Sequence, residues 1–71
     1  MRRIPVSSSN LKSIGYDADT RILEIEFQTG AVYRYFQVPE SEYRGLMNAA
    51  SHGKYFHANI RNRYRYEKVR R

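Results

Sequence analysis

Basic and aromatic side chains are interleaved in the last third of the chain, and this segment is the part of the sequence best suited to bind a ligand. Residues 51–71 contain seven Lys or Arg residues and one acidic residue, whereas residues 1–50 contain six basic and six acidic residues. The net charge of +6 therefore belongs to the C-terminal segment. Because cations neutralise phosphates and aromatic rings stack on nucleobases, this composition favours a nucleic-acid surface.

The candidate contacts lie on one side of a predicted helix and on the strand expected after it. Successive helical residues are turned by about 100°, so Lys54, His57 and Arg61 share one side of a helix that follows Ser51. Arginine suits phosphate because its planar fork binds two oxygens at once. The same charges also fit a solvated face of a small basic protein, so both interpretations stay open. The predicted nucleic-acid contacts are Lys54, His57, Arg61, Arg63, Arg65, Tyr64 and Tyr66.

The other reactive residue types lack the spacing that catalysis or metal binding needs. His52 and His57 are five residues apart, off the four-residue spacing of a helical ligand pair, and the chain has no cysteine. The serines at 7–9 have no general base placed beside them. Gly53 and Lys54, at a helix N-terminus, suit one bound anion at most. We therefore expect no enzyme activity, no catalytic residue, no metal and no cofactor.

Length and composition predict a single small domain. The chain has 71 residues, and a core of this size rarely supplies more than about 3–5 kcal/mol. Without cysteine there is no disulfide, so the 7 tyrosines and 3 phenylalanines are expected to supply much of the core. No segment has the length and apolar composition of a signal peptide or a membrane span. A soluble, cytoplasmic protein without a membrane partner is expected.

The first half of the chain predicts a three-stranded antiparallel meander. Apolar and polar residues alternate every second residue from 11 to 38, which is the periodicity of strands. A turn at 17–20, rich in aspartate, follows a first strand at 11–16 and places Ile14 near Leu23.

The length of the next loop decides how the second and third strands pair. A two-residue loop would place Arg34 on the apolar face, whereas a three-residue loop at 28–30, with Gly30 in the left-handed conformation, satisfies both faces. Tyr33 and Tyr35 are then expected to point into the core. The predicted cross-strand pairs are Leu23 with Tyr35, Ile25 with Tyr33 and Glu24 with Arg34.

The second half of the chain predicts two helices and a final strand. Pro39 suits a first helical position. The residues that recur on one face of the first helix are Tyr43, Leu46, Met47 and Ala50. Ser51 is a good N-cap for a second helix running to about Arg61, and alternation returns at 64–69. The predicted fold is α+β in the order β-β-β-α-α-β: a three-stranded meander, two helices on one face and a final C-terminal strand, whose edge in the sheet is left open.

The sheet face away from the helices offers a second candidate surface. In the predicted register it carries apolar side chains beside paired charges, which suits a protein partner or self-association. The alternative is that the N-terminal arm covers this face. The candidate interface residues are Ile22, Val32 and Phe36. The expected organisation is a flexible N-terminal arm at 1–8, a domain at 9–69 and a basic tail at 70–71.

An ordered set of residues resembles the KTSC domain family over roughly 7–69. The set includes Ile14-Gly15-Tyr16-Asp17, the run 23–27, Gly30, the central Tyr33-Arg34-Tyr35 and Val38-Pro39. The family is named after a module at the C-terminus of some lysyl-tRNA synthetases and also occurs as small stand-alone bacterial proteins. The resemblance implies a non-enzymatic module in which Tyr33 and Tyr35 are mainly structural. RNA binding is the function suggested for the family, so the expected partner is RNA, as tRNA or a single strand. A specific tRNA role does not follow from the resemblance, because this chain has no synthetase attached.

Overall fold

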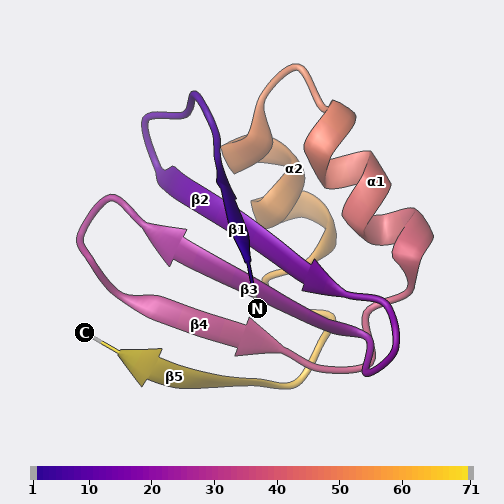
Figure 1. Cartoon of the computed structure of the whole chain (residues 1–71). Helices are drawn as coiled ribbons and strands as arrows, with labels where there is room; N and C mark the ends of the chain where they lie inside the picture. The colour runs from indigo at the N-terminus through magenta and orange to yellow at the C-terminus, as the bar shows by residue number, and fades with distance from the viewer. Residues whose placement is uncertain (1, 71) are drawn as a thin grey trace.

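Five antiparallel strands form one sheet, and two helices cover one of its faces (Figure 1). The computed structural model describes residues 2–70, with the side chain of Arg70 excepted. The elements are β1 (Arg3–Pro5), β2 (Leu11–Asp17), β3 (Ile22–Phe27), β4 (Val32–Tyr35), α1 (Glu40–Asn48), α2 (His52–Asn59) and β5 (Tyr66–Arg70). The strands follow one another in the sheet as they do in the chain. The α+β class and the C-terminal strand are confirmed, whereas the sheet has five strands rather than four.

The hairpin of β3 and β4 has the predicted register. Glu24 lies opposite Arg34, and the two tyrosines of β4 lie opposite apolar residues of β3. Gly30 has a φ of 95°, the left-handed conformation that a three-residue loop requires at this position. The amide of Phe27 donates to the carbonyl of Ala31 at 2.9 Å and closes the loop. The loop prediction is therefore confirmed.

The pairing of β2 with β3 differs from the predicted one. Ile14 lies opposite Ile25 and not near Leu23 as expected. The reason is that β2 continues to Asp17, so that the turn occupies residues 18–21, one residue later than expected, which shifts the pairing by two residues. Arg21, at the end of the turn, has a φ of 58°. An arginine gives no sign in the sequence that its backbone is left-handed. The turn was therefore predicted from the aspartates alone, and its position is wrong.

Helix α1 packs its apolar face on the sheet, but it is shorter than the run of apolar residues at helical spacing predicts. Pro39 is the N-cap, with extended backbone, and not the first helical residue. Leu46 is fully buried, and Met47 packs against the core. The helix ends at Asn48, so Ala50 lies outside it and is exposed, and its predicted place on the buried face is wrong.

Helix α2 begins where the sequence predicts. The Ser51 hydroxyl accepts a hydrogen bond from the amide of Lys54 at 3.2 Å, which confirms the N-cap. The helix ends at Asn59, two residues before the predicted end at Arg61. Its inner side carries Phe56, which is 3 % exposed. Arg61 therefore lies beyond the last residue of the helix.

The segment expected to be a loose arm contains strand β1. Residues 3–5 pair antiparallel with β2, so that Arg3 lies opposite Gly15. A Cβ built on Gly15 would be 2.8 Å from the backbone oxygen of Arg2, so only glycine permits this close approach. A strand of three residues is too short to be recognised in the sequence by alternation of apolar and polar residues.

Strand β5 joins the sheet at β4, which settles the edge that the sequence leaves open. Tyr66 lies opposite Tyr35, and the strand starts two residues after the predicted start at Tyr64. Of the predicted basic tail, Arg70 ends β5, and Arg71 lies outside the described residues.

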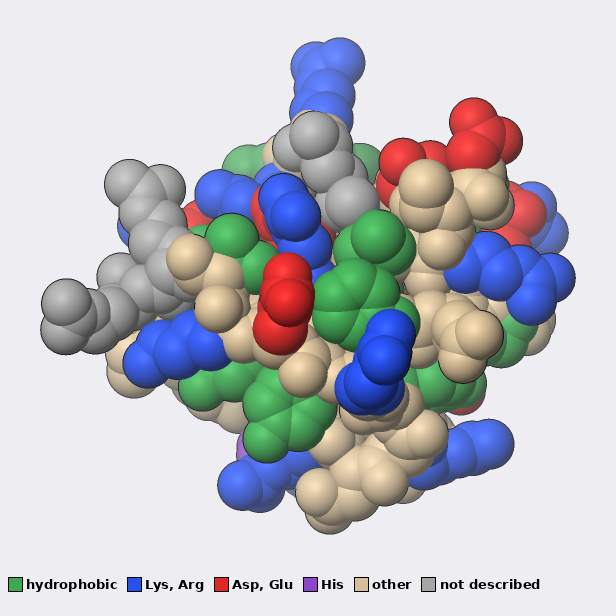
Figure 2. Space-filling model, turned by 90° about the horizontal axis from the view of Figure 1, so that it is seen from below, with side chains coloured by type: hydrophobic (Ala, Val, Ile, Leu, Met, Phe, Trp, Pro, Cys, Tyr) green, Lys and Arg blue, Asp and Glu red, His purple; other side chains and the backbone are tan. Residues whose placement is uncertain are grey.

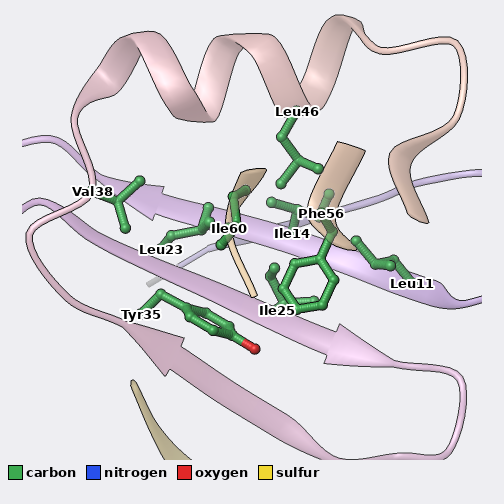
Figure 3. Close-up of a cluster of buried hydrophobic side chains, with 9 residues drawn as sticks. All are labelled: Leu11, Ile14, Leu23, Ile25, Tyr35, Val38, Leu46, Phe56 and Ile60. Atoms are coloured by element: carbon green, nitrogen blue, oxygen red, sulfur yellow. The ribbon is translucent and has the colours of Figure 1, made fainter. Parts of the chain in front are cut away.

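The core lies between the helices and the sheet (Figure 3). Tyr35 is 4 % exposed and its ring lies close to Phe56, as expected for a structural tyrosine. Tyr33 is only partly buried and packs against the edge of the core. The buried cluster consists of Leu11, Ile14, Leu23, Ile25, Tyr35, Val38, Leu46, Phe56 and Ile60.

Candidate nucleic-acid interface

A cleft of about 560 Å³ opens between α2 and the β4–β5 end of the sheet, next to the turn that leads into β4. Its lining combines aromatic rings with cationic and amide side chains, the combination that the sequence predicts for a nucleic-acid surface. The rings are those of Phe27, Tyr33, Tyr35, Phe56 and Tyr66. The polar lining residues are Asn10, Thr29, His57, Arg61, Asn62 and Lys68.

The five rings of the cleft form one continuous cluster. The Tyr33 and Tyr66 centroids are 5.6 Å apart, and those of Tyr35 and Tyr66 are 5.5 Å apart. Phe27 and Phe56 extend the cluster under α2, with centroids 5.4 Å apart. Tyr66 is 53 % exposed, whereas the rings beneath it are largely covered. The cleft therefore has an aromatic floor and one ring that faces solvent.

The hydroxyl groups of the cleft tyrosines lie close enough to influence one another. Burial raises the pKa of Tyr35, the hydroxyls of Tyr33 and Tyr66 raise it further, and Arg61 opposes them. Tyr35 thus stays protonated far above neutral pH. No other described residue bonds to its hydroxyl, which reaches the cleft and is free to bond to a ligand.

Two predicted contact residues, His57 and Arg61, lie together on the α2 side of the cleft. A guanidinium nitrogen of Arg61 is 3.4 Å from Nδ1 of His57, and the Asn10 amide is 3.2 Å from Nε2 of the same ring. His57 and Asn10 also line a second hollow of about 410 Å³ at the start of α2, which Lys54 borders. The side of α2 on which the sequence places Lys54, His57 and Arg61 thus connects two neighbouring depressions.

Arg63 and Tyr64 lie away from the cleft, next to a carboxylate of α1. The hydroxyls of Tyr64 and Tyr55 donate to Glu42 at 2.8 and 2.6 Å. The hydrogen bond that the Tyr55 hydroxyl donates to Glu42, together with burial, raises the pKa of Tyr55 to about 12. A guanidinium nitrogen of Arg63 is 4.0 Å from Glu42. The carboxylate thus joins α1 to α2 and to the turn before β5.

Arg65 lies over the ring of Phe36, 5.2 Å from its centroid, and does not line the cleft. Seen from below, Lys and Arg side chains are spread over the surface with hydrophobic side chains between them (Figure 2). The predicted basic residues are therefore divided: Arg61 lines the cleft together with His57, Lys54 borders the neighbouring hollow, and Arg63 and Arg65 lie elsewhere.

Charged pairs occupy much of the outer face of the sheet. Glu24 is 4 % exposed, and its carboxylate pairs with Arg3 of β1 and, at 2.8 Å, with Arg34 of β4. Burial alone would raise the pKa of Glu24, but the hydrogen bonds and charges of Arg34 and Arg3 outweigh it and lower the pKa. The N-terminal segment thus joins the sheet as its edge strand, and the side chain of Arg3 reaches across this face to Glu24.

The three candidate interface residues differ in exposure. Val32 is 3 % exposed and presents almost no surface. Ile22 and Phe36 are partly exposed, and the guanidinium of Arg65 covers one side of the Phe36 ring. The apolar surface that the sequence suggests is thus smaller in the folded chain.

The histidines do not form a ligand pair. His52 Nδ1 donates to the carbonyl of Leu46 at 2.8 Å and so ties α2 to α1. Over residues 2–70, no three His, Cys, Asp or Glu side chains come close enough together to hold a metal ion. None of the helices in that range is long and apolar enough to span a bilayer.

Sequence reasoning missed part of the cleft. Lys68 follows Tyr66 by two residues, so strand alternation alone would have placed it on the same face. Asn10, Thr29 and Asn62 carry no such signal, because they come from three separate loops that only the fold brings together.

Known proteins share this fold and much of this sequence. A family model described as the KTSC domain matches residues 7–64. A crystal structure of a KTSC domain protein from Yersinia pestis has a TM-score of 0.94 and 43% identity, with 96% of each chain covered. An uncharacterised protein of Stutzerimonas stutzeri is 41% identical over 70 residues, 97% of this chain and 99% of its own. A lysine–tRNA ligase of Trichormus variabilis is 41% identical over 61 residues, which are 86% of this chain and 11% of the ligase.

Proposed function

The chain belongs to the KTSC domain family, and from that membership we propose that it is a non-enzymatic module that binds RNA through the cations and rings of its C-terminal third. A location in the cytoplasm goes with this proposal. The observation that carries it is the cleft between α2 and β5, where cationic side chains adjoin an aromatic floor. Phosphate neutralisation supplies affinity, and ring stacking adds to it.

The cations at the cleft are available to a ligand. Neither Arg61 nor Lys68 forms an ion pair with another described residue, and both are exposed. By contrast, Arg63 has Glu42 as a neighbour, and Arg34 is paired with Glu24. We therefore assign the main phosphate contacts to Arg61 and Lys68, with Lys54 next to them, and a lesser role to Arg63 and Arg65.

The ligase relatives support RNA as the ligand class. The matched segment makes up 11% of the Trichormus variabilis ligase, whose named activity concerns a tRNA. The same domain also makes up nearly the whole of the Stutzerimonas stutzeri relative, so it does not depend on an attached ligase. A general affinity for RNA fits both settings.

Titration of the protein with labelled single-stranded RNA, tRNA and duplex DNA at two salt concentrations tests the proposal. We expect RNA to bind more tightly than duplex DNA, with an affinity that falls steeply with salt, by about 0.7 log unit per log salt for each phosphate contacted. The double variant Arg61→Gln, Lys68→Gln should weaken binding and make this slope shallower by about 1.4.

Arg44→Gln is the control, because Arg44 is exposed on α1, paired with Glu40 at 3.0 Å and absent from the cleft lining. It removes one charge and should leave the slope nearly unchanged. If the wild-type protein binds none of the three nucleic acids at low salt, the proposed function is wrong. If Arg44→Gln weakens binding as much as the cleft variant, only the total charge matters.

The rival function, docking of a protein or of a second copy on the outer sheet face, rests on less surface. Of its three candidate residues, Val32 is buried and Phe36 is partly covered by Arg65. Sedimentation over a range of concentrations separates the two functions. A dimer that Phe36→Asp dissociates would favour this rival.

A further inference from the structure

We propose that the cleft between α2 and β5 receives the base of one unpaired nucleotide on its aromatic floor, with the neighbouring phosphates held at Arg61 and Lys68. This inference rests on the RNA-binding function proposed above and names the part of the RNA that the site takes. It differs from simple attraction of a polyanion, because it requires the rings as well as the charges.

The rings form a platform and not a slot. A base held between two rings needs about 7 Å between their planes, two layers of carbon contact. The centroids of Tyr33, Tyr35 and Tyr66 are only 5.5–6.4 Å apart, so these rings already fill the space between one another. A base must therefore lie on the cluster from the solvent side. Tyr66, which is 53 % exposed, offers the largest accessible ring there.

The volume of the cleft fits a base with its sugar. A value of about 560 Å³ lies within the ~300–1,000 Å³ typical of sites for small organic ligands. Such sites combine an apolar lining with a few placed polar groups, and here the free hydroxyl of Tyr35, the side-chain amide of Asn62 and the side-chain carbonyl oxygen of Asn10 are available. These groups can bond to a base edge or to a 2′-hydroxyl.

The two cations reach the cleft from different elements. Arg61 follows α2, and Lys68 lies on β5, opposite Tyr33 in the sheet. A strand that places one base on the floor therefore meets a positive charge from each of these elements. Beyond Arg61, His57 leads into the hollow that Lys54 borders, which continues the cationic path.

The geometry selects an unpaired base over a duplex. A paired and stacked base shows a protein only its edge, whereas the floor of the cleft offers ring faces. Only a base that is splayed out of a stack presents its own face to them. The ligand class is therefore a single strand, loop or end of RNA.

The experiment compares Tyr66→Ala, Tyr66→Phe and wild type by fluorescence anisotropy. The probe is an oligouridine of about eight nucleotides, within the ~4–16 that single-strand-binding folds cover, and a second probe has the same backbone with abasic riboses. We expect Tyr66→Ala to weaken oligouridine binding roughly 5- to 150-fold, as loss of one stacked base does, and Tyr66→Phe to retain it. The abasic probe should bind wild type as weakly as oligouridine binds Tyr66→Ala.

Val69→Ala is the matched control on the same strand, since Val69 is 45 % exposed and does not line the cleft. Circular dichroism verifies that each variant is folded. The base-binding inference is wrong, while RNA binding stands, under two results obtained together. Tyr66→Ala would bind oligouridine as tightly as wild type does, and wild type would bind the abasic probe as tightly as it binds oligouridine. If wild type binds no RNA, the proposed function is wrong and this inference falls with it.

Discussion

The two tyrosines of the Tyr-Arg-Tyr motif point to the same side of β4 but have different surroundings. Tyr35 is 4 % exposed and packs against Phe56, with ring centroids 5.5 Å apart. Tyr33 lies two residues nearer the loop, is only partly buried and borders the cleft with its ring. One tyrosine therefore stabilises the core, and the other shapes a surface.

We expect the loss of the buried ring of Tyr35 to reduce stability much more than the loss of the exposed ring of Tyr66. Tyr35→Ala should reduce the free energy of unfolding by about 3–5 kcal/mol, the cost of removing a buried ring, whereas Tyr66→Ala should cost about 1 kcal/mol or less. Urea unfolding followed by circular dichroism measures both. Equal losses for the two variants would mean that Tyr66 belongs to the core.

Gly45 stands inside α1, although glycine weakens helices, because the Tyr55 ring of α2 lies against it. A Cβ built on Gly45 would be 2.7 Å from Cζ of Tyr55, whose hydroxyl is held by Glu42. We expect Gly45→Ala to lower stability by about 1–3 kcal/mol, since overpacking exceeds the helical gain of about 1 kcal/mol. Thermal and urea unfolding provide the measurement.

Gly53→Ala is the matched control for this prediction. A Cβ at Gly53 would meet its nearest atom, Cβ of Asn10, at 3.5 Å, which is ordinary contact. Alanine should therefore be neutral there or stabilise α2 by up to about 1 kcal/mol. If Gly45→Ala stabilises as much as Gly53→Ala does, Tyr55 does not constrain the packing of the two helices.

Among the elements, β1 depends most on a single residue of its neighbour. Gly15 of β2 lets the backbone of β1 approach, and Arg3 of β1 then reaches the carboxylate of Glu24 on β3. The short strand thus completes a charge cluster whose members come from three strands and surround the buried carboxylate of Glu24. This arrangement gives a three-residue edge strand a specific place in the sheet.

We expect Gly15→Ala to release β1 while the rest of the sheet remains folded. The added methyl group would lie 2.8 Å from the backbone oxygen of Arg2, and a backbone atom moves only if the strand moves. Hydrogen exchange should show loss of protection at the β1–β2 amides, with the β3–β4 hairpin as the internal reference. Unchanged protection at β1 would show that the sheet absorbs the methyl group locally.

At the scale of the whole molecule, the buried carboxylate of Glu24 makes stability depend on acid. The pKa of Glu24 is lowered from its ordinary value of 4.5, so the folded state binds fewer protons than the unfolded chain as the pH falls through this range. The contribution of Glu24 is complete above the ordinary pKa and is lost as the pH drops through the folded one.

Urea unfolding between neutral pH and about pH 3 should therefore show declining stability, and Glu24→Gln should flatten this decline. The variant is also expected to be less stable at neutral pH, because it leaves Arg3 and Arg34 without their common partner. Glu67→Gln, at an exposed position of β5, is the control and should keep the acid dependence of wild type. An acid profile unchanged by Glu24→Gln would contradict the assignment.

The sequence by itself determined the local structure of this protein. Alternation and Gly30 specified the β3–β4 hairpin, because a pleated strand with one buried face admits one register. Ser51 specified the start of α2, since its hydroxyl satisfies an amide within the same turn. The composition also located the cationic segment and its rings, and an ordered set of residues identified the family.

Only the tertiary structure decided which of these groups meet. The edge that β5 joins, the pairing of β1 and the burial of Val32 depend on contacts between distant residues, which carry no local periodicity. For the same reason, Arg61 and Lys68 share a cleft while Arg63, close to Arg61 in sequence, lies beside Glu42. Charge and ring count follow from composition, but a binding site requires side chains from separate elements at one place, and packing alone fixes that.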